Sequence, residues 1–193
     1  MVTGSEGNGG GRRSDRTKAA ILAAARERFA AHGYERTTIR GVASDAGIDP
    51  SMVMRYFGNK VQLFDAALAI DLRLPELSEV SAEDLPRTLV RHFLTRWEGD
   101  PADDALLVLL RSAVTNERAA ARIHDVFAAQ VAPALAAAGG PDLAAGRAAL
   151  VSAQLLGLAL TRYLLRLPAV VALTPDQIER SLAPAIAATL NPT

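Results

Sequence analysis

Apolar residues in the first part of the chain recur at the spacing of a helix rather than of a strand. Ile21, Ala25 and Phe29 lie four residues apart and so share one helical face, and Gly33 then interrupts the pattern. Ser14 or Asp15 stands before the first apolar turn, where its side-chain oxygen can accept a hydrogen bond from the helix N-terminus. The pattern therefore predicts a first helix over residues 14–33.

Two shorter helices are expected next, joined by a tight turn. Thr37 offers a hydroxyl as N-cap to a helix over residues 38–46. After a turn at 47–49, Pro50 suits the first position of a helix over 50–57, because its fixed φ is helical and its missing N–H is not needed there. The third helix is therefore very short.

Proline residues divide the rest of the chain into further helical segments. Asn59 is expected to cap a fourth helix. Pro133 is expected to kink or split the third of the later segments, and Pro184 to disturb the last. These later segments are predicted at 83–98, 102–114, 116–138, 142–167 and 175–190.

Composition supports an all-α fold. Half of the residues are hydrophobic but only 5% are aromatic, and Ala and Leu dominate over the β-branched types. The absence of cysteine excludes disulfides and thiolate metal sites. The N-terminus lacks the apolar core of a signal peptide, and the longest uncharged stretches are shorter than the roughly 20 residues of a membrane helix. We therefore expect a cytoplasmic protein with no membrane partner, metal or cofactor.

Charge is distributed unevenly along the chain. The first 60 residues carry 10 Lys and Arg against 6 Asp and Glu, whereas residues 61–193 carry 11 against 15, although the whole chain is neutral. This asymmetry suggests that the front part meets a polyanion.

The two short helices and their turn match a helix-turn-helix, whose second helix enters the major groove of DNA. Val53 and Phe57 lie one turn apart and can anchor this helix, which leaves other side chains to contact bases and phosphates. Helix N-termini suit phosphate, and arginines after the tail can reach a minor groove. The candidate DNA-contacting residues are Arg12, Arg13, Arg16, Thr37, Thr38, Pro50, Ser51, Met52, Arg55, Tyr56 and Lys60.

Residues 17–64 resemble the DNA-binding domain of the TetR (tetracycline-repressor) family of bacterial transcriptional regulators. The resemblance rests on Phe29, Gly33-Tyr34, Thr37-Thr38-Ile39, Val42-Ala43, Ala46-Gly47-Ile48, Tyr56-Phe57, Lys60 and Leu63-Phe64. It implies a homodimer that binds palindromic double-stranded operator DNA, usually as a repressor, and that a small molecule releases by entering the C-terminal domain.

Two positions depart from the family pattern. Gly41 stands where an acidic residue is frequent, and a glycine softens a helix by up to about 1 kcal/mol relative to alanine. Met54 stands where a tyrosine commonly touches the DNA backbone, so that role does not carry over to this residue.

The pattern and the resemblance together predict three parts. Residues 1–13 form a disordered Gly-rich tail, residues 14–60 the helix-turn-helix DNA-binding domain, and residues 61–193 a helical ligand-binding and dimerisation domain whose first helix is the connector.

A dimer interface is expected on the segment at 145–167 and on the last helix. The former is apolar nearly all round, and its small residues Ala149, Ala153 and Gly157 would let another helix approach closely. The last helix carries an apolar stripe with Ile178, Leu182 and Ile186. Periodicity alone favours an intramolecular core, whereas the resemblance, in which the last two helices build the dimer, favours the interface.

The ligand pocket is expected where aromatic and polar residues interrupt apolar helices of the rear domain, because such a mixture is typical of a binding site. Its effector would be largely apolar, and core packing is the alternative for each residue. The candidates are His92, Phe93, Trp97, Asn116, His124, Phe127, Gln154, Thr161 and Tyr163.

Two other functions are considered. An enzyme is not indicated, since the chain has no Gly-x-Ser-x-Gly elbow, P-loop or cysteine nucleophile, and its three histidines lack metal-ligand spacing. The remaining alternative is an all-α module that binds a protein through its front helices without binding DNA.

Overall fold

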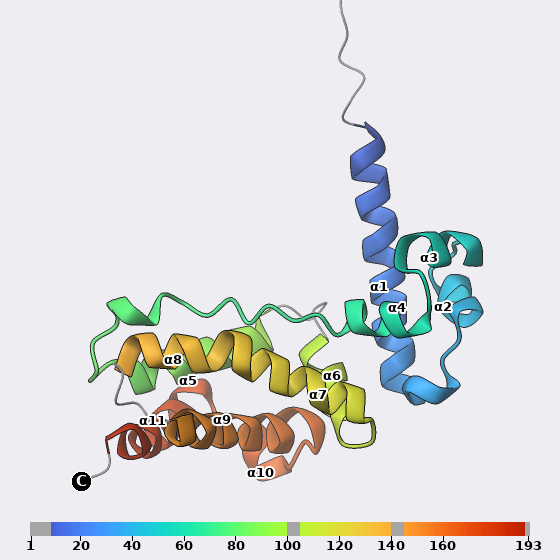
Figure 1. Cartoon of the computed structure of the whole chain (residues 1–193). Coiled ribbons are helices and arrows are strands. Elements are labelled where there is room, and N and C mark those ends of the chain that lie inside the picture. The colour runs from blue at the N-terminus through green and yellow to red at the C-terminus, as the bar shows by residue number, and fades with distance from the viewer. Residues whose placement is uncertain (1–8, 100–104, 140–144, 192–193) are drawn as a thin grey trace, which may run out of the picture. The chain divides into compact units, whose positions relative to one another are not determined.

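The computed structural model describes residues 9–99, 105–139 and 145–191, and within these ranges it is built of helices and contains no β-strand (Figure 1). The chain divides into two units, Met1–Ala69 and Ile70–Thr193. The expectation of an all-α protein with a helical front part and a helical rear part is confirmed.

The first unit, called the head, contains four helices: α1 (Gly9–Arg36), α2 (Ile39–Asp45), α3 (Pro50–Phe57) and α4 (Lys60–Ala67). Its core joins α1 to α4, where the rings of Phe29 and Phe64 meet edge to face with centroids 4.8 Å apart. Tyr34 packs on both rings and closes this aromatic cluster. The predicted break at Gly33 is present, because this residue has φ 73° and ψ 175° inside α1.

Two predicted boundaries of the head are wrong. Helix α1 begins at Gly9, so that residues 9–13 of the expected disordered tail are helical, while residues 1–8 lie outside the described ranges. Helix α4 is part of the head rather than a connector, because Leu63, Phe64 and Ala67 are buried and α4 packs on α1. The units therefore meet at Ala69 and Ile70, nine residues later than expected at 60 and 61.

The second unit begins with an extended segment, which we call the connector (residues 70–76), and a short 3₁₀ turn η1 (Leu77–Glu79). Two π-helical segments, η2 and η3, continue α7 and α9, and sequence periodicity did not predict them. The elements of this unit are α5 (Leu85–Glu98), α6 (Ala105–Ala113), α7 (Glu117–Val126), η2 (Phe127–Val131), α8 (Ala132–Gly139), α9 (Ala145–Ala159), η3 (Leu160–Leu164), α10 (Pro168–Val171) and α11 (Pro175–Leu190).

Pro133 and Pro184 affect their helices in different ways. The predicted split at Pro133 is seen as the change from η2 to α8, with Pro133 in the first turn of α8, where its missing N–H costs little. Helix α11 instead continues through Pro184, whose ring lies on the exposed side. The short helix α10 was not predicted.

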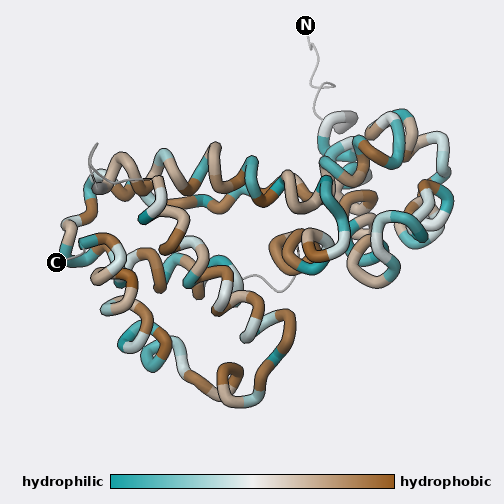
Figure 2. The backbone as a smooth tube through the Cα atoms, turned by 60° about the horizontal axis from the view of Figure 1, so that its bottom comes forward, coloured by the Kyte–Doolittle hydropathy of each residue, from teal (hydrophilic) through white to brown (hydrophobic). Residues whose placement is uncertain are grey.

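The core of the second unit lies where α5 and α9 both pack against α11. Hydrophobic positions, brown in Figure 2, recur along these helices. From α11, Ile178 and Ile186 are 3% and 0% exposed and contact the apolar faces of the other two helices. The stripe on the last helix therefore fills the core of its own chain.

Candidate functional site

Helix α3 is short, but it is fixed at its N-terminus and along its inner face. The Asp49 carboxylate accepts a hydrogen bond from the Ser51 backbone N–H at 2.8 Å, as expected for an N-cap. Hydrogen bonds from the Ser51 hydroxyl and N–H lower the pKa of Asp49, so the cap stays ionised. Val53 is fully buried, whereas Met54 and Arg55 are exposed. An anchored helix thus presents one outer face.

Two cationic side chains lie near the ring of Tyr56, at the end of this face. The Arg55 guanidinium and the Lys18 ammonium lie 5.4 Å and 5.7 Å from its ring centroid. A hydrogen bond from Ser14 and the neighbouring Arg55 lower the pKa of the Tyr56 hydroxyl. Lys18 was not among the candidate residues; its sequence position six residues beyond Arg12 gave no sign that it would face α3.

Thr37 was expected both to cap α2 and to contact DNA, and both expectations are wrong. Its side chain is buried, and its hydroxyl donates to the carbonyl oxygen of Gly33 at 2.8 Å, also lying 3.3 Å from that of Arg28. Both carbonyls belong to α1 near its break at Gly33, so the Thr37 hydroxyl holds the chain at this break. The exposed Thr38 is the N-cap, and its hydroxyl accepts from the Gly41 N–H at 3.1 Å.

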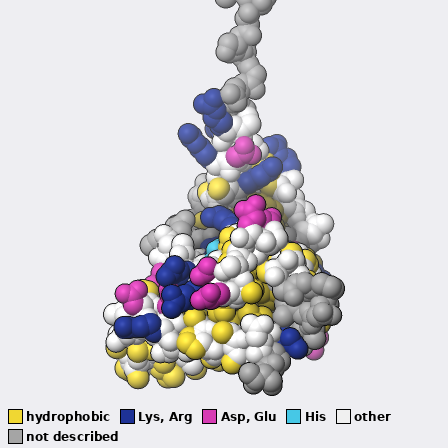
Figure 3. Space-filling view, turned by 90° about the vertical axis from the view of Figure 1, so that its left-hand side faces the viewer, with side chains coloured by type: hydrophobic (Ala, Val, Ile, Leu, Met, Phe, Trp, Pro, Cys, Tyr) yellow, Lys and Arg dark blue, Asp and Glu magenta, His cyan; other side chains and the backbone are white. Residues whose placement is uncertain are grey.

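The remaining candidates of the head lie in different environments. Arg12, Arg13 and Arg16 are exposed on the first turns of α1. Figure 3 shows Lys and Arg side chains, in dark blue, on the surface of the molecule. Lys60 is half-buried, with its ammonium 4.3 Å from the Tyr34 ring centroid and donating to the Glu35 carbonyl at 3.1 Å. Lys60 therefore braces the head, with N–H groups left over for an anion.

The packing of α2 on α1 brings the Arg28 side chain over the glycine at position 41. Arg28 of α1 forms an ion pair with Asp45 of α2 at 2.5 Å, and its guanidinium crosses Gly41 so closely that a Cβ there would collide with it. The side-chain hydrogen bond from Arg28 is the main cause that lowers the pKa of Asp45. Gly41 thus leaves room for the ion pair that joins the two helices.

The second unit contains a cavity of about 160 Å³ between its helices. Four of the predicted pocket residues line it: His92, Phe93, Trp97 and Phe127. Most of the wall is aliphatic, and Arg96 and Ser152 are polar lining residues that the sequence analysis missed. The other lining residues are Leu72, Leu74, Leu89, Leu106, Leu109, Leu110, Ile123, Val126, Val131, Leu135, Val151, Leu155 and Leu156.

Five predicted pocket residues do not line the cavity, because each has another role or position. Asn116 caps α7 through a hydrogen bond from the Ala119 N–H, and His124 is exposed. Gln154 donates to Thr189 of α11 at 2.7 Å. Thr161 donates to the Gly157 carbonyl within its own helix at 2.8 Å. Tyr163 lies behind the wall instead of in it.

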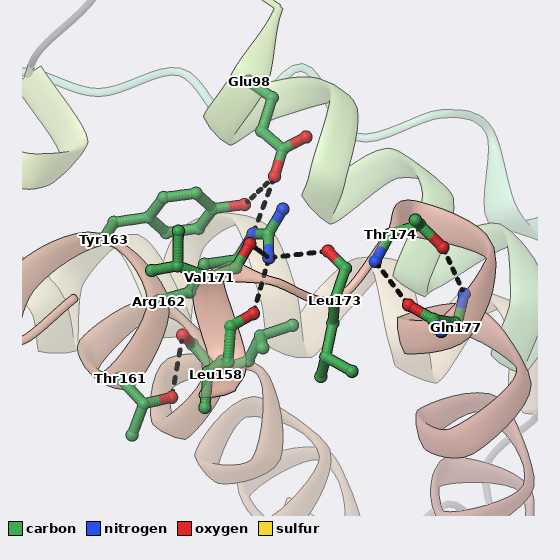
Figure 4. Close-up of polar contacts among 10 residues, drawn as sticks. Glu98, Leu158, Thr161, Arg162, Tyr163, Val171, Leu173, Thr174 and Gln177 are labelled. Carbon is green, nitrogen blue, oxygen red and sulfur yellow. Dashed lines mark hydrogen bonds and ion pairs between the residues drawn. The ribbon is translucent and has the colours of Figure 1, made fainter. Parts of the chain in front are cut away.

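Tyr163 belongs to a polar network with Glu98 and Arg162 (Figure 4), and it lies against Trp97, which lines the cavity. Its ring stacks on that of Trp97 with centroids 4.8 Å apart, and its hydroxyl donates to Glu98 at 2.8 Å. Arg162 pairs with the same carboxylate at 2.9 Å and also donates to the Val170, Val171 and Leu173 carbonyls. Burial and the Glu98 carboxylate raise the pKa of the Tyr163 hydroxyl, which therefore remains a donor.

The predicted dimer residues divide between surface and core. Ala149, Ala153 and Gly157 are exposed on α9, and nothing lies within 4 Å of a Cβ placed at Gly157. The same face carries Leu150, which is 59% exposed. By contrast, Ile178 and Ile186 are buried and so cannot form an interface, while Leu182 packs against the core and is partly exposed. The exposed small residues of α11 are Ser181, Ala185 and Ala188.

Two absences hold for the described ranges. No helix there is long and apolar enough to cross a membrane. In the same ranges no group of three or more His, Asp or Glu side chains is placed to hold a metal ion.

Comparison with known proteins matches both units. Residues 21–67 match the family model described as "Bacterial regulatory proteins, tetR family", and residues 83–190 match "Tetracyclin repressor-like, C-terminal domain". An HTH-type transcriptional repressor of Mycobacterium tuberculosis is 40% identical over 77 residues, which are 38% of this chain and 41% of the relative. The match to these curated relatives thus spans less than half of their length.

Solved structures resemble nearly the whole chain. A TetR-family regulator from Streptomyces coelicolor has a TM-score of 0.62 and 29% identity, covering 97% of this chain and 99% of its own. NalD, the secondary repressor of the MexAB-OprM multidrug efflux pump in Pseudomonas aeruginosa, has a TM-score of 0.66 and 22% identity, covering 90% and 96%. The second likeness concerns the fold alone.

Proposed function

The chain belongs to the tetR family of bacterial regulatory proteins, and we propose that it represses transcription by binding a palindromic operator as a homodimer that a small molecule releases. The observation that carries the proposal is the construction of α3. Its cap and its buried Val53 hold it firmly, while Ser51, Met54 and Arg55 remain exposed and Met52 and Tyr56 half-exposed. A helix held in this way can enter a major groove as a rigid body.

Base reading and phosphate binding are assigned to different residues. Arg55 has the donor geometry to bind a guanine edge, and Met52 can contact a thymine methyl. Phosphate contacts are assigned to Tyr56 with Lys18, to the Thr38 end of α2, and to Arg12, Arg13 and Arg16. Thr37 is excluded, because it is buried.

We place the dimer contact on the exposed face of α9 and the small-residue side of α11. Ala149, Ala153 and Gly157 allow a second helix to approach closely, and Leu150 supplies apolar area. A two-fold operation brings the same face of the partner onto this surface, because such an isologous patch closes on itself. The dimer would then hold two copies of α3 about 34 Å apart, the distance between successive major grooves.

The effector is proposed to be a compact, largely apolar molecule. The cavity of about 160 Å³ is walled by leucines, Phe93, Trp97 and Phe127. A cavity of about 150 Å³ with aliphatic and aromatic walls admits benzene, so an aromatic ring or a short acyl chain is of the right size. Such a molecule would lower operator affinity by favouring a different spacing of the two heads.

The experiment that tests this function is selection of duplexes from a randomised pool, followed by mobility shift at two salt concentrations. We expect a palindromic sequence to be enriched and its affinity to fall steeply between 50 and 200 mM salt, because the bound phosphates release counterions. No enriched duplex, or binding that salt does not change, would favour the protein-interaction module instead.

A further inference from the structure

We infer that Gln130 fastens the connector to the wall of the cavity, and that a ligand acts on the head by releasing this fastening. The inference rests on the proposed function and names the residue through which occupancy of the cavity reaches the DNA-binding unit. The contacts of the connector that carry this inference all lie in the second unit, which the chain itself joins to α4.

The Gln130 side-chain amide holds the connector backbone by two hydrogen bonds. Its Nε2 donates to the Ile70 carbonyl at 2.7 Å, and its Oε1 accepts from the Leu72 N–H at 2.8 Å. An amide is the side-chain group that can donate and accept at once in this way. Residues 70 and 72 are far from residue 130 in sequence, and they belong to no helix that would satisfy these backbone groups itself.

Two other side chains hold the same stretch. The Nε2 atom of His92 lies 2.9 Å from the Leu72 carbonyl, which requires that this nitrogen carry the proton. The Arg96 guanidinium lies 3.4 Å from the Asp71 carbonyl. His92 and Arg96 both line the cavity, and so do Leu72 and Leu74 of the connector. The connector is therefore one wall of the cavity and is held there by its neighbours in that wall.

Gln130 lies where helix geometry changes. It belongs to the π-helical segment η2, in which Phe127 and Val131 line the cavity while Gln130 reaches the connector. Single π-helical turns inside α-helices occur frequently at functional sites. The short segment η2 thus lines the cavity that a ligand would occupy and also holds the connector backbone that the ligand would move.

The link from this fastening to the head is only two residues long. The Ala67 carbonyl, at the end of α4, accepts a hydrogen bond from Arg26 of α1 at 2.9 Å. Leu68 and Ala69 alone separate it from Ile70, the first residue that Gln130 holds. These two residues are themselves tied to α4, because the Leu68 and Ala69 N–H groups donate to the Phe64 and Ala66 carbonyls at 3.0 Å and 3.3 Å. A ligand that displaces Leu72 or Leu74 would therefore act on α4.

The test measures hydrogen-exchange protection of the Leu72 amide and affinity for the selected duplex in the full chain. Gln130→Met keeps the side-chain length but removes both hydrogen bonds, and we expect protection to fall about thirtyfold, as for the loss of two ordinary hydrogen bonds. Gln130→Glu keeps an acceptor for the Leu72 N–H but can donate to the Ile70 carbonyl only when its carboxyl is protonated, so it should retain more Leu72 protection than Gln130→Met. Gln154→Met, which loses the bond to Thr189, is the matched control and should leave both readouts unchanged.

Benzene serves as the probe of the cavity, and Trp97, the one tryptophan of the chain, reports its entry by fluorescence. In the wild type, benzene should change Trp97 emission, reduce Leu72 protection and weaken duplex binding. In Gln130→Met it should change Trp97 emission without a further effect on the duplex. The inference is overturned if Gln130→Met responds as the wild type does, or if benzene leaves the wild-type Trp97 signal unchanged. A protein that binds no duplex would instead refute the proposed function, while Leu72 protection would still test the fastening.

Discussion

Arg55 is the exposed cation in the last turn of α3, and the Tyr56 ring lies beside its guanidinium. If Arg55 reads a base, Arg55→Ala should cost about 1–3 kcal/mol of operator affinity and relax the preference at one position of each half-site. Dimerisation should be unaffected. The measurement is a fluorescence-anisotropy titration with the selected duplex and with duplexes changed at single positions.

The matched control for this substitution is Arg111→Ala, which removes an exposed arginine from α6. Its operator affinity should equal that of the wild type. Equal affinity for Arg55→Ala as well would remove Arg55 from the DNA-binding site.

Thr37 offers a test of a structural role against a DNA-binding one. Thr37→Val removes the hydroxyl that satisfies the Gly33 and Arg28 carbonyls, so the free energy of unfolding should fall by about 1–3 kcal/mol. Thr37→Ser keeps the hydroxyl and should recover most of the stability. Urea denaturation measures both, and unchanged stability of Thr37→Val together with weaker DNA binding would contradict the assignment.

Residue roles were predictable where they depend on neighbours in sequence. Asp49, Pro50 and Asn59 do what their positions indicated, because capping and the fixed φ of proline are local effects. Thr37 and Thr38 are adjacent and chemically identical, so only the tertiary contact with the end of α1 decides which one caps α2. Gln154 and Thr189 likewise lie 35 residues apart, which hides their hydrogen bond from sequence reasoning.

The break in α1 is the clearest test at the level of an element. Gly33 combines φ 73° with ψ 175°, a region that only glycine enters easily, although nothing would collide with a Cβ there. Gly33→Ala should therefore lower the free energy of unfolding by about 1–3 kcal/mol through backbone strain alone.

Gly11→Ala is the control in the same helix, because that position is helical and equally open. It should be neutral or stabilise the protein by up to about 1 kcal/mol. Equal stabilities of the two variants in urea denaturation would show that the break at Gly33 is not required.

Periodicity predicted which segments are helices, but it did not always predict what the apolar face of a helix packs against. The stripe on α11 is the example: its spacing shows that Ile178 and Ile186 must be buried, yet it cannot say whether the partner is the same chain or a second copy. The π-helical segments η2 and η3 were not predicted either, because each spans only five residues, too few for a separate period to be read from the sequence.

At the scale of the whole molecule, the proposed dimer depends on the small residues of α9. Gly157→Asp places a charge on this exposed face, and we expect the dimer to dissociate more readily and operator affinity to fall in step, because two linked heads bind better than one. Sedimentation equilibrium and mobility shift measure the two effects.

Ala121→Asp places the same charge on an exposed position of α7 and should change neither quantity. A monomeric Gly157→Asp protein that binds the operator with full affinity would separate dimerisation from DNA binding and so contradict the proposed arrangement.

The most direct test of the central claim is a hydroxyl-radical footprint of the wild-type protein on the selected duplex. Two copies of α3 in successive major grooves predict two protected segments related by two-fold symmetry, with centres about 10 base pairs or a multiple apart. The bound complex should contain an even number of chains. A single protected segment with one chain per duplex would contradict the account.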